Sequence, residues 1–151
     1  MRWLALDIGA ERVGLAVSDS GESIATPAGV VPFRNATDLV ERIARIVAER
    51  EIDAIVVGVP QTRRGASRGE KRVGEVLRAL RERLTLVVEE ENETGTTRAA
   101  EEALRDAGIP SRRWARVADG VAAQFILQAH LATRRGQRAG ERAVDLVDDE
   151  C

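Results

Sequence analysis

Apolar runs separated by glycine or charged residues divide the chain into five predicted strands. Residues 2–8 and 12–18 form the first two, and the Gly-Ala-Glu sequence between them predicts a tight hairpin turn. A third extended stretch covers residues 24–31 and ends at Pro32. The remaining two are DAIVVGVP, residues 53–60, and TLVVEEE, residues 85–91. The former is almost entirely apolar, which is typical of a central strand covered on both faces.

Apolar residues that recur every three or four positions predict four helices. Either Asn35 or Thr37 is the expected N-cap of the first helix, and Gly108 is the expected stop of the third. From about Arg135 the periodicity is lost, and we expect disorder there. The predicted helices cover residues 35–51, 73–84, 94–108 and the stretch from about 118 onward, with loops at 61–72 and 109–116.

Three strands followed by alternating helices and strands predict an α/β fold in which a mixed sheet is flanked by helices. The 151 residues suit one domain, which we place at residues 1–135. We expect residues 136–151 to form a disordered acidic tail. Without the last four acidic residues of the chain, Asp145, Asp148, Asp149 and Glu150, the net charge would change from −2 to +2.

Composition argues against several classes of protein and site. Hydrophobic residues make up 44% of the chain, yet no run approaches the ~18 apolar residues that a membrane helix needs. No charged-then-apolar leader is recognisable, so we expect a cytoplasmic protein without a membrane segment. The only cysteine is Cys151 and the only histidine is His130, which argues against disulfides, a zinc centre and a Cys–His dyad. We expect a structural role for His130.

Three acidic features lie within or beside predicted core elements: Asp7 in the first strand, the run Glu89–Glu93 at the end of the fifth, and Asp119 at the start of the last helix. A carboxylate in a core strand is unfavourable unless it is paired or binds a metal ion. Carboxylates that meet in one cleft would hold Mg²⁺ or Mn²⁺, which prefer oxygen ligands. Ordinary roles stay open: pairing of Asp7 with Arg12 or turn amides, solvation of the acidic run, and a helix-dipole interaction of Asp119.

Basic residues near these acids offer contacts to phosphate, because a planar guanidinium binds two oxygens at once. Such contacts would position a nucleic acid without reading its sequence. The ordinary alternative is solubilising charge. The candidates are Arg12, Arg63, Arg64, Arg68, Lys71, Arg113 and Arg116.

Three blocks of sequence together resemble the YqgF/RuvX family of RuvC-like nucleases. They are LALDIGAERVGLAVSD (residues 4–19), IVVGVP followed by Gly65 (residues 55–65), and VADGVAAQFILQ (residues 117–128). The likeness covers roughly residues 3–131. It implies an RNase H-like fold with a mixed five-stranded sheet. It also implies phosphodiester cleavage that depends on Mg²⁺ or Mn²⁺, and a role in maturing the 5′ end of 16S rRNA. Asp7 and Asp119 would be metal-binding catalytic acids.

One block departs from the pattern of that family. Where the family often has Asp-Glu-Arg, this chain has Glu91, Asn92 and Glu93. We prefer Glu91 as the third catalytic acid and metal ligand, because it keeps an acid where the family has one and directly ends the strand. Glu93 is the alternative metal ligand.

Several functional hypotheses therefore stand side by side. The leading one is a nuclease acting on RNA, namely pre-16S rRNA, with single-stranded or branched DNA as further candidates. A Holliday-junction-resolvase-like DNA nuclease is the first alternative. An actin-like ATPase-type phosphotransferase shares a hairpin with an aspartate and glycines, although the chain is short for two domains. A binding module without catalysis is the last. The sequence leaves open whether the protein forms a homodimer.

Overall fold

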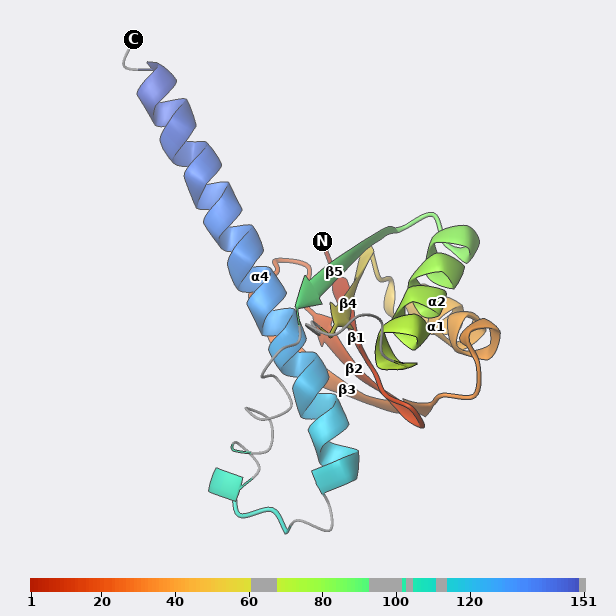
Figure 1. Ribbon diagram of the computed structural model, residues 1–151. Coiled ribbons are helices and arrows are strands. Elements are labelled where there is room, and N and C mark those ends of the chain that lie inside the picture. Colours follow the sequence, from red (N-terminus) through yellow and green to blue (C-terminus); the bar gives the residue numbers. More distant parts are fainter. Residues whose placement is uncertain (61–67, 93–101, 103–104, 111–113, 150–151) are drawn as a thin grey trace.

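A single five-stranded sheet forms the centre of the computed structural model (Figure 1). The structure describes residues 1–60, 68–92, 102, 105–110 and 114–149, with only the backbone described for residues 114–119 and 138–149. The strands are β1 (Trp3–Ile8), β2 (Arg12–Ser18), β3 (Ala25–Pro32), β4 (Ala54–Val59) and β5 (Val87–Asn92). Their order is β3-β2-β1-β4-β5; β1–β2 and β2–β3 are antiparallel, and β1–β4 and β4–β5 are parallel. The predicted mixed sheet is confirmed.

Helices cover both faces of this sheet. On one face lie α1 (Ala36–Arg50) and α2 (Arg68–Arg83), and α4 (Trp114–Asp149) crosses the other (Figure 1). Asn35 caps α1, since its side-chain oxygen accepts a hydrogen bond from the Asp38 N–H at 2.8 Å. The alternative cap, Thr37, is already helical. α2 begins at Arg68, so residues 68–72, which were predicted to end a loop, are helical.

The helix predicted at residues 94–108 falls largely outside the described residues. In the part that is described, Gly108 has φ +74, a left-handed conformation that suits glycine at the end of a helix. Its N–H donates to the Arg105 carbonyl at 3.0 Å, so Gly108 follows a helical turn as predicted.

α4 differs from its prediction at both ends. It begins at Trp114, so Asp119 lies in its second turn and not at its start. It continues to Asp149, although the loss of periodicity after Arg135 predicted disorder. A helix needs an apolar stripe only where it packs on other elements, so hydrophobic periodicity cannot mark its end beyond the core. The domain boundary at residue 135 stays a prediction. Within the described residues, neither α4 nor another helix is both long and apolar enough to cross a membrane.

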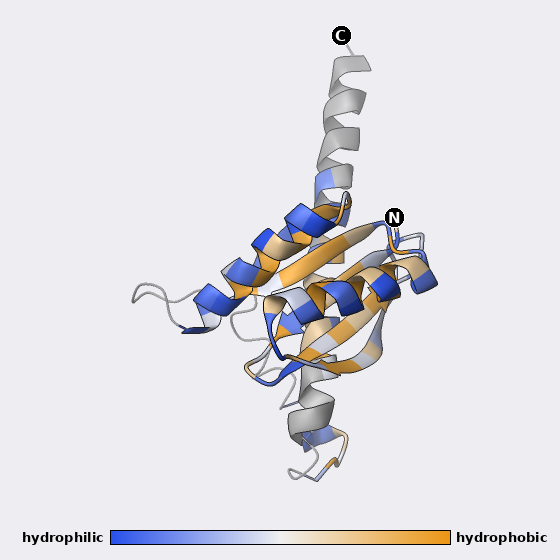
Figure 2. Cartoon of the chain, turned by 90° about the vertical axis from the view of Figure 1, so that its right-hand side faces the viewer, coloured by the Kyte–Doolittle hydropathy of each residue, from blue (hydrophilic) through white to orange (hydrophobic). Residues whose placement is uncertain are grey.

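Two apolar layers hold the sheet between its helices. Figure 2 shows the outward sides of α1 and α2 as hydrophilic and the strands behind them as largely hydrophobic. Leu4, Leu6 and Ile8 of β1 join the cluster on the α1 and α2 side, whereas Trp3 and Ala5 join the cluster that includes α4. Because side chains alternate along a strand, the next residue in the α4-facing row of β1 is Asp7.

Candidate active site

Asp7 stands in a row of residues that crosses four strands, β2, β1, β4 and β5, on the face covered by α4. It lies opposite Gly14 of β2 and is half-buried. On the other side of Asp7 lies β4. The β1–β4 register pairs Leu6 with Val57, so the residue of β4 beside Asp7 is Gly58. Gly58 in turn pairs with Glu91 of β5. Two strand spacings separate the backbones at Asp7 and Glu91, roughly 10 Å. Since Gly58 has no side chain, β4 places no side chain between these two acids.

The turn after β1 presents backbone groups beside Asp7. The Gly9 N–H donates to the Arg12 carbonyl at 2.8 Å and closes the hairpin. A Cβ atom at Gly9 would lie 2.8 Å from the same carbonyl oxygen, so only glycine fits there. The surface of this turn forms a shallow depression of about 260 Å³, which is lined by Gly9, Ala10, Glu11 and Arg12.

Asp119 lies in the second turn of α4. Gly120, the next residue, lies beside Pro27 of β3, since a Cβ atom added at Gly120 would be 3.9 Å from the Pro27 Cβ. Farther along α4, Arg134 lies over Trp3 at the beginning of β1. The helix therefore crosses this face of the sheet from β3 toward the start of β1, and Asp119 belongs to its β3 end.

Glu91 makes its contact with α4 and not with Asp7. Its Oε2 lies 3.1 Å from Nδ1 of His130, in hydrogen-bond geometry. On the other side of the ring, Oε2 of Glu89 lies 2.9 Å from Nε2, an ion-pair distance without hydrogen-bond alignment. The His130 side chain is only 6% exposed. His130 thus joins α4 to the carboxylates of β5, in line with a structural role.

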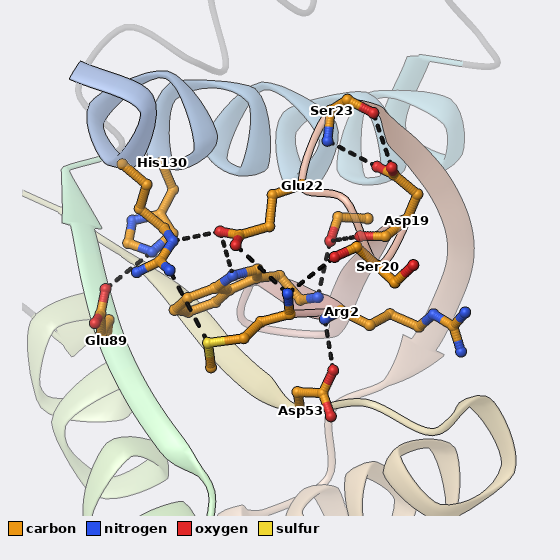
Figure 3. A network of polar contacts seen from close by, with 12 residues as sticks. Arg2, Asp19, Ser20, Glu22, Ser23, Asp53, Glu89 and His130 are labelled. Atoms are coloured by element: carbon orange, nitrogen blue, oxygen red, sulfur yellow. Dashed lines mark hydrogen bonds and ion pairs between the residues drawn. The ribbon is translucent and has the colours of Figure 1, made fainter. Parts of the chain in front are cut away.

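A polar network fastens α4 to the start of β1 (Figure 3). At its centre is Glu22, which is buried in the loop between β2 and β3. Glu22 accepts hydrogen bonds from Nε1 of Trp3, at 3.1 Å, and from Nε of Arg134. The Arg134 guanidinium also lies over the Trp3 ring, 4.8 Å from its centroid, and the His130 and Trp3 rings form a T-shaped pair with centroids 4.6 Å apart. Sequence reasoning missed Glu22, because an isolated glutamate in a short polar loop carries no periodic signal.

Glu22 is expected to make stability depend on pH in the acid range. Burial alone would raise the pKa of Glu22, but the hydrogen bonds and charge of Arg134, together with Trp3, lower it from 4.5 to about 2. The unfolded chain therefore takes up the proton first, and the stabilisation is lost as pH falls from about 4.5 to about 2. Glu22→Gln should flatten this part of a stability–pH curve measured by urea unfolding, by about 2 kcal/mol or less. Glu49→Gln, at an exposed site of α1, is the control, and an equal flattening by both variants would contradict the role of Glu22.

Asp19, which belongs to the first resembling block, serves the same loop. It accepts hydrogen bonds from the Ile24 N–H, from the Ser23 hydroxyl and from the Ser23 N–H, each at 2.8 Å. These bonds lower the pKa of Asp19 well below its usual range. Asp19 therefore shapes the loop that carries Glu22 and does not belong to the row of Asp7.

The predicted phosphate contacts are only partly described. Arg12 opens β2 and is half-buried, and Arg68 and Lys71 are exposed in the first turn of α2. Within the residues whose side chains are described, no group of three or more His, Cys, Asp or Glu side chains is arranged to hold a metal ion. The predicted site residues that fall outside this description are Glu93, Arg63, Arg64 and Arg113, and, for the side chain alone, Arg116 and Asp119.

Two solved structures with the same fold are of proteins in complex with Holliday junctions. One is T. thermophilus RuvC in complex with a Holliday junction substrate, with a TM-score of 0.59 and 20% identity, over 90% of this chain and 96% of that one. Another is the fowlpox virus resolvase bound to Holliday junction DNA, with a TM-score of 0.55 and 10% identity, over 88% and 98% of the two chains. At these identities the likeness establishes the RuvC-like, RNase H-like fold alone, as the sequence predicted.

Sequence relatives are closer. A Chloroflexus aggregans protein named "Putative pre-16S rRNA nuclease" is 38% identical over 133 residues, which cover 87% of this chain and 94% of that protein. A Nocardia farcinica protein of the same name is 35% identical over 160 residues, or 98% and 89% of the two chains. The family model described as "RuvX: Holliday junction resolvase" matches residues 1–133. The chain therefore belongs to the RuvX family.

Proposed function

We propose that this protein is a nuclease that hydrolyses phosphodiester bonds in the precursor of 16S rRNA with Mg²⁺ or Mn²⁺ as cofactor. The observation that carries the proposal is the placement of two acids on facing elements. Asp7 ends the α4-facing row of β1, and Asp119 lies in the second turn of α4, the helix that crosses this face of the sheet. The names of the sequence relatives support RNA as the substrate.

The donor set suits a hard divalent cation. Asp7 and Asp119 supply carboxylate oxygens, which Mg²⁺ and Mn²⁺ prefer over nitrogen and sulfur. When bound, such an ion would lower the pKa of a water molecule and stabilise the charge that develops on the scissile phosphate. The chain itself holds Asp7 on a paired strand of the sheet, and Gly58 leaves the adjacent position without a side chain. A fixed acid with no side chain on the neighbouring strand suits the approach of a phosphodiester.

The third acid is proposed to be Glu91 or Glu93. Glu91 lies in the same sheet row as Asp7, which supports our preference for it. Its carboxylate is nevertheless bonded to His130, and it would have to leave that ring, or share one oxygen with it, to reach an ion. Glu93, the alternative, follows two residues later in the sequence. Removing each carboxylate separately distinguishes the two.

A cleavage assay on three substrates tests the proposed function. We expect the protein to cut a labelled 5′ precursor fragment of 16S rRNA in Mn²⁺ or Mg²⁺, and to be inactive in excess chelator. Glu91→Gln and Glu93→Gln should differ, because only the variant that lacks the true metal ligand should lose activity at limiting metal concentration and regain part of that activity at high metal concentration. Labelled single-stranded DNA and a four-way DNA junction complete the panel.

Other outcomes of the same panel would contradict the proposal. Cleavage of the four-way junction without cleavage of RNA would favour a junction resolvase, the second candidate, which the description of the matching family model supports. Turnover of ATP without any nucleic acid would favour a phosphotransferase. Metal-independent cleavage would overturn the assignment of the acids.

A further inference from the structure

Arg72 of α2 lies over the ring of Phe33. No pattern in the sequence had marked Phe33 as a site residue. The guanidinium carbon is 5.9 Å from the ring centroid. Phe33 is half-buried and packs against the core layer beneath α1 and α2, so its ring is held in place. A cation–π contact orders an arginine without using its N–H groups. Arg72 is therefore positioned with its hydrogen-bond donors still able to bind an oxygen ligand.

The same phenylalanine is anchored to the hairpin that follows Asp7. The Phe33 N–H donates to the Glu11 carbonyl at 2.8 Å, and Pro32, just before it, pairs with Arg12. The exposed Arg34 follows Phe33 directly. The fold thus brings three segments that carry basic residues next to Phe33: the β1–β2 hairpin, the β3–α1 connection and α2.

Charged groups of both signs lie around Phe33. Asp38, the first acid of α1, is engaged by Arg42 at 3.0 Å. Glu11 is exposed in the hairpin, and Glu70 belongs to the first turn of α2. Exposed Lys71 adds a further positive charge next to Arg72 in α2. Several basic residues that lie close together suit a ligand with several negative charges in a row better than a single anion.

We propose that Arg34 and Arg72, the latter ordered by Phe33, bind successive phosphates of a single-stranded RNA and lead it past the Gly9–Arg12 turn toward Asp7. The inference rests on the proposed function for the identity of the ligand, since a nuclease needs its substrate strand held on both sides of the reacting phosphate. It adds Phe33 and Arg34 to the phosphate contacts predicted from the sequence, and it gives Arg72, which belongs to the same basic run as Arg68 and Lys71, a defined position over the Phe33 ring.

The test is the salt dependence of RNA binding by the full chain. A labelled single-stranded RNA is titrated in chelator, so that no cleavage occurs, at several salt concentrations. Each lost phosphate contact should reduce the slope of log K against log salt by about 0.7 for a single strand. Arg34→Gln combined with Arg72→Gln should therefore lower the slope by about 1.4. The control is Arg45→Gln combined with Arg78→Gln, which removes the same charge from exposed sites of α1 and α2.

Phe33→Leu separates ordering from charge. It keeps an apolar side chain against the core but removes the ring beneath Arg72. We expect weaker binding, about 2- to 5-fold, with nearly the parental salt slope, because both positive charges remain. Affinity equal to that of the parent would remove Phe33 from the site.

Failure of this inference is distinguishable from failure of the proposed function. If the parent cleaves RNA but the two double variants change the slope equally, the surface is wrong and the nuclease assignment stands. If the parent binds RNA with the expected loss of slope yet cleaves nothing under any metal condition, the surface stands and the activity is wrong. A parent that neither binds nor cleaves RNA overturns both.

Discussion

Asp7→Asn should reduce cleavage of the RNA substrate by roughly 100-fold or more while leaving the protein folded. A metal-assisted step typically draws several kcal/mol from charge stabilisation, and the loss of several kcal/mol corresponds to at least that factor in rate. Asparagine keeps the size of aspartate, so the half-buried site in β1 loses a charge without gaining a cavity. Initial rates at matched Mn²⁺ concentration measure the effect, and circular dichroism confirms the fold.

Asp106→Asn is the matched control, because it makes the same chemical change at an exposed position. RNA binding in chelator should survive in Asp7→Asn, since the phosphate contacts lie on other residues. Equal rates for Asp7→Asn and the parent would refute the role of Asp7 in catalysis. Survival of binding together with loss of cleavage would also exclude a module that only binds nucleic acid.

Trp3→Ala should lower the free energy of unfolding by about 3–5 kcal/mol, the range seen when a large buried aromatic side chain is removed. Trp3 is fully buried on the α4 side of the sheet. Its ring lies under the Arg134 guanidinium, and its Nε1 donates to buried Glu22. The substitution therefore opens a cavity and leaves Glu22 with fewer hydrogen-bond donors. Urea unfolding followed by circular dichroism measures the change.

Trp3→Phe separates the two contributions. It keeps most of the buried ring and removes the N–H, so we expect a loss well below that of Trp3→Ala. A further arm uses Ile24→Ala, at a position where the side chain is 63% exposed, as a control for loss of apolar surface without a cavity. If Trp3→Ala cost no more than Ile24→Ala, the packing of α4 on Trp3 would not stabilise the fold as inferred.

The attachment of α4 also bears on the candidate site. Asp119 belongs to the first turns of α4, whereas the contacts of His130 and Arg134 with β5 and Glu22 lie farther along the helix. These contacts help to set the angle at which α4 crosses the sheet and therefore the position of Asp119 over it. A polar network that looks purely structural is thus coupled to the proposed chemistry.

The sequence by itself determined most of the sheet and marked Asp7 as unusual. The apolar runs predicted β1, β2 and β4 nearly to the residue, because a strand covered on one or both faces must be apolar at those positions. Asn35 was among the predicted caps, since capping depends on local chemistry. Asp7 stood out because a carboxylate interrupts a run that has to be buried. Its role in catalysis, like those of Asp119 and Glu91, stays a prediction.

Only the tertiary structure decided which distant residues meet. The pairing of Glu91 with His130 depends on the β4–β5 register and on the angle of α4, neither of which has a local signature. The contact of Arg72 with Phe33 likewise joins segments 39 residues apart in sequence through the packing of α2 on the sheet. Periodicity reports that a side chain is buried, but not against which partner, because apolar packing is non-directional and long-range pairing is set by the whole fold.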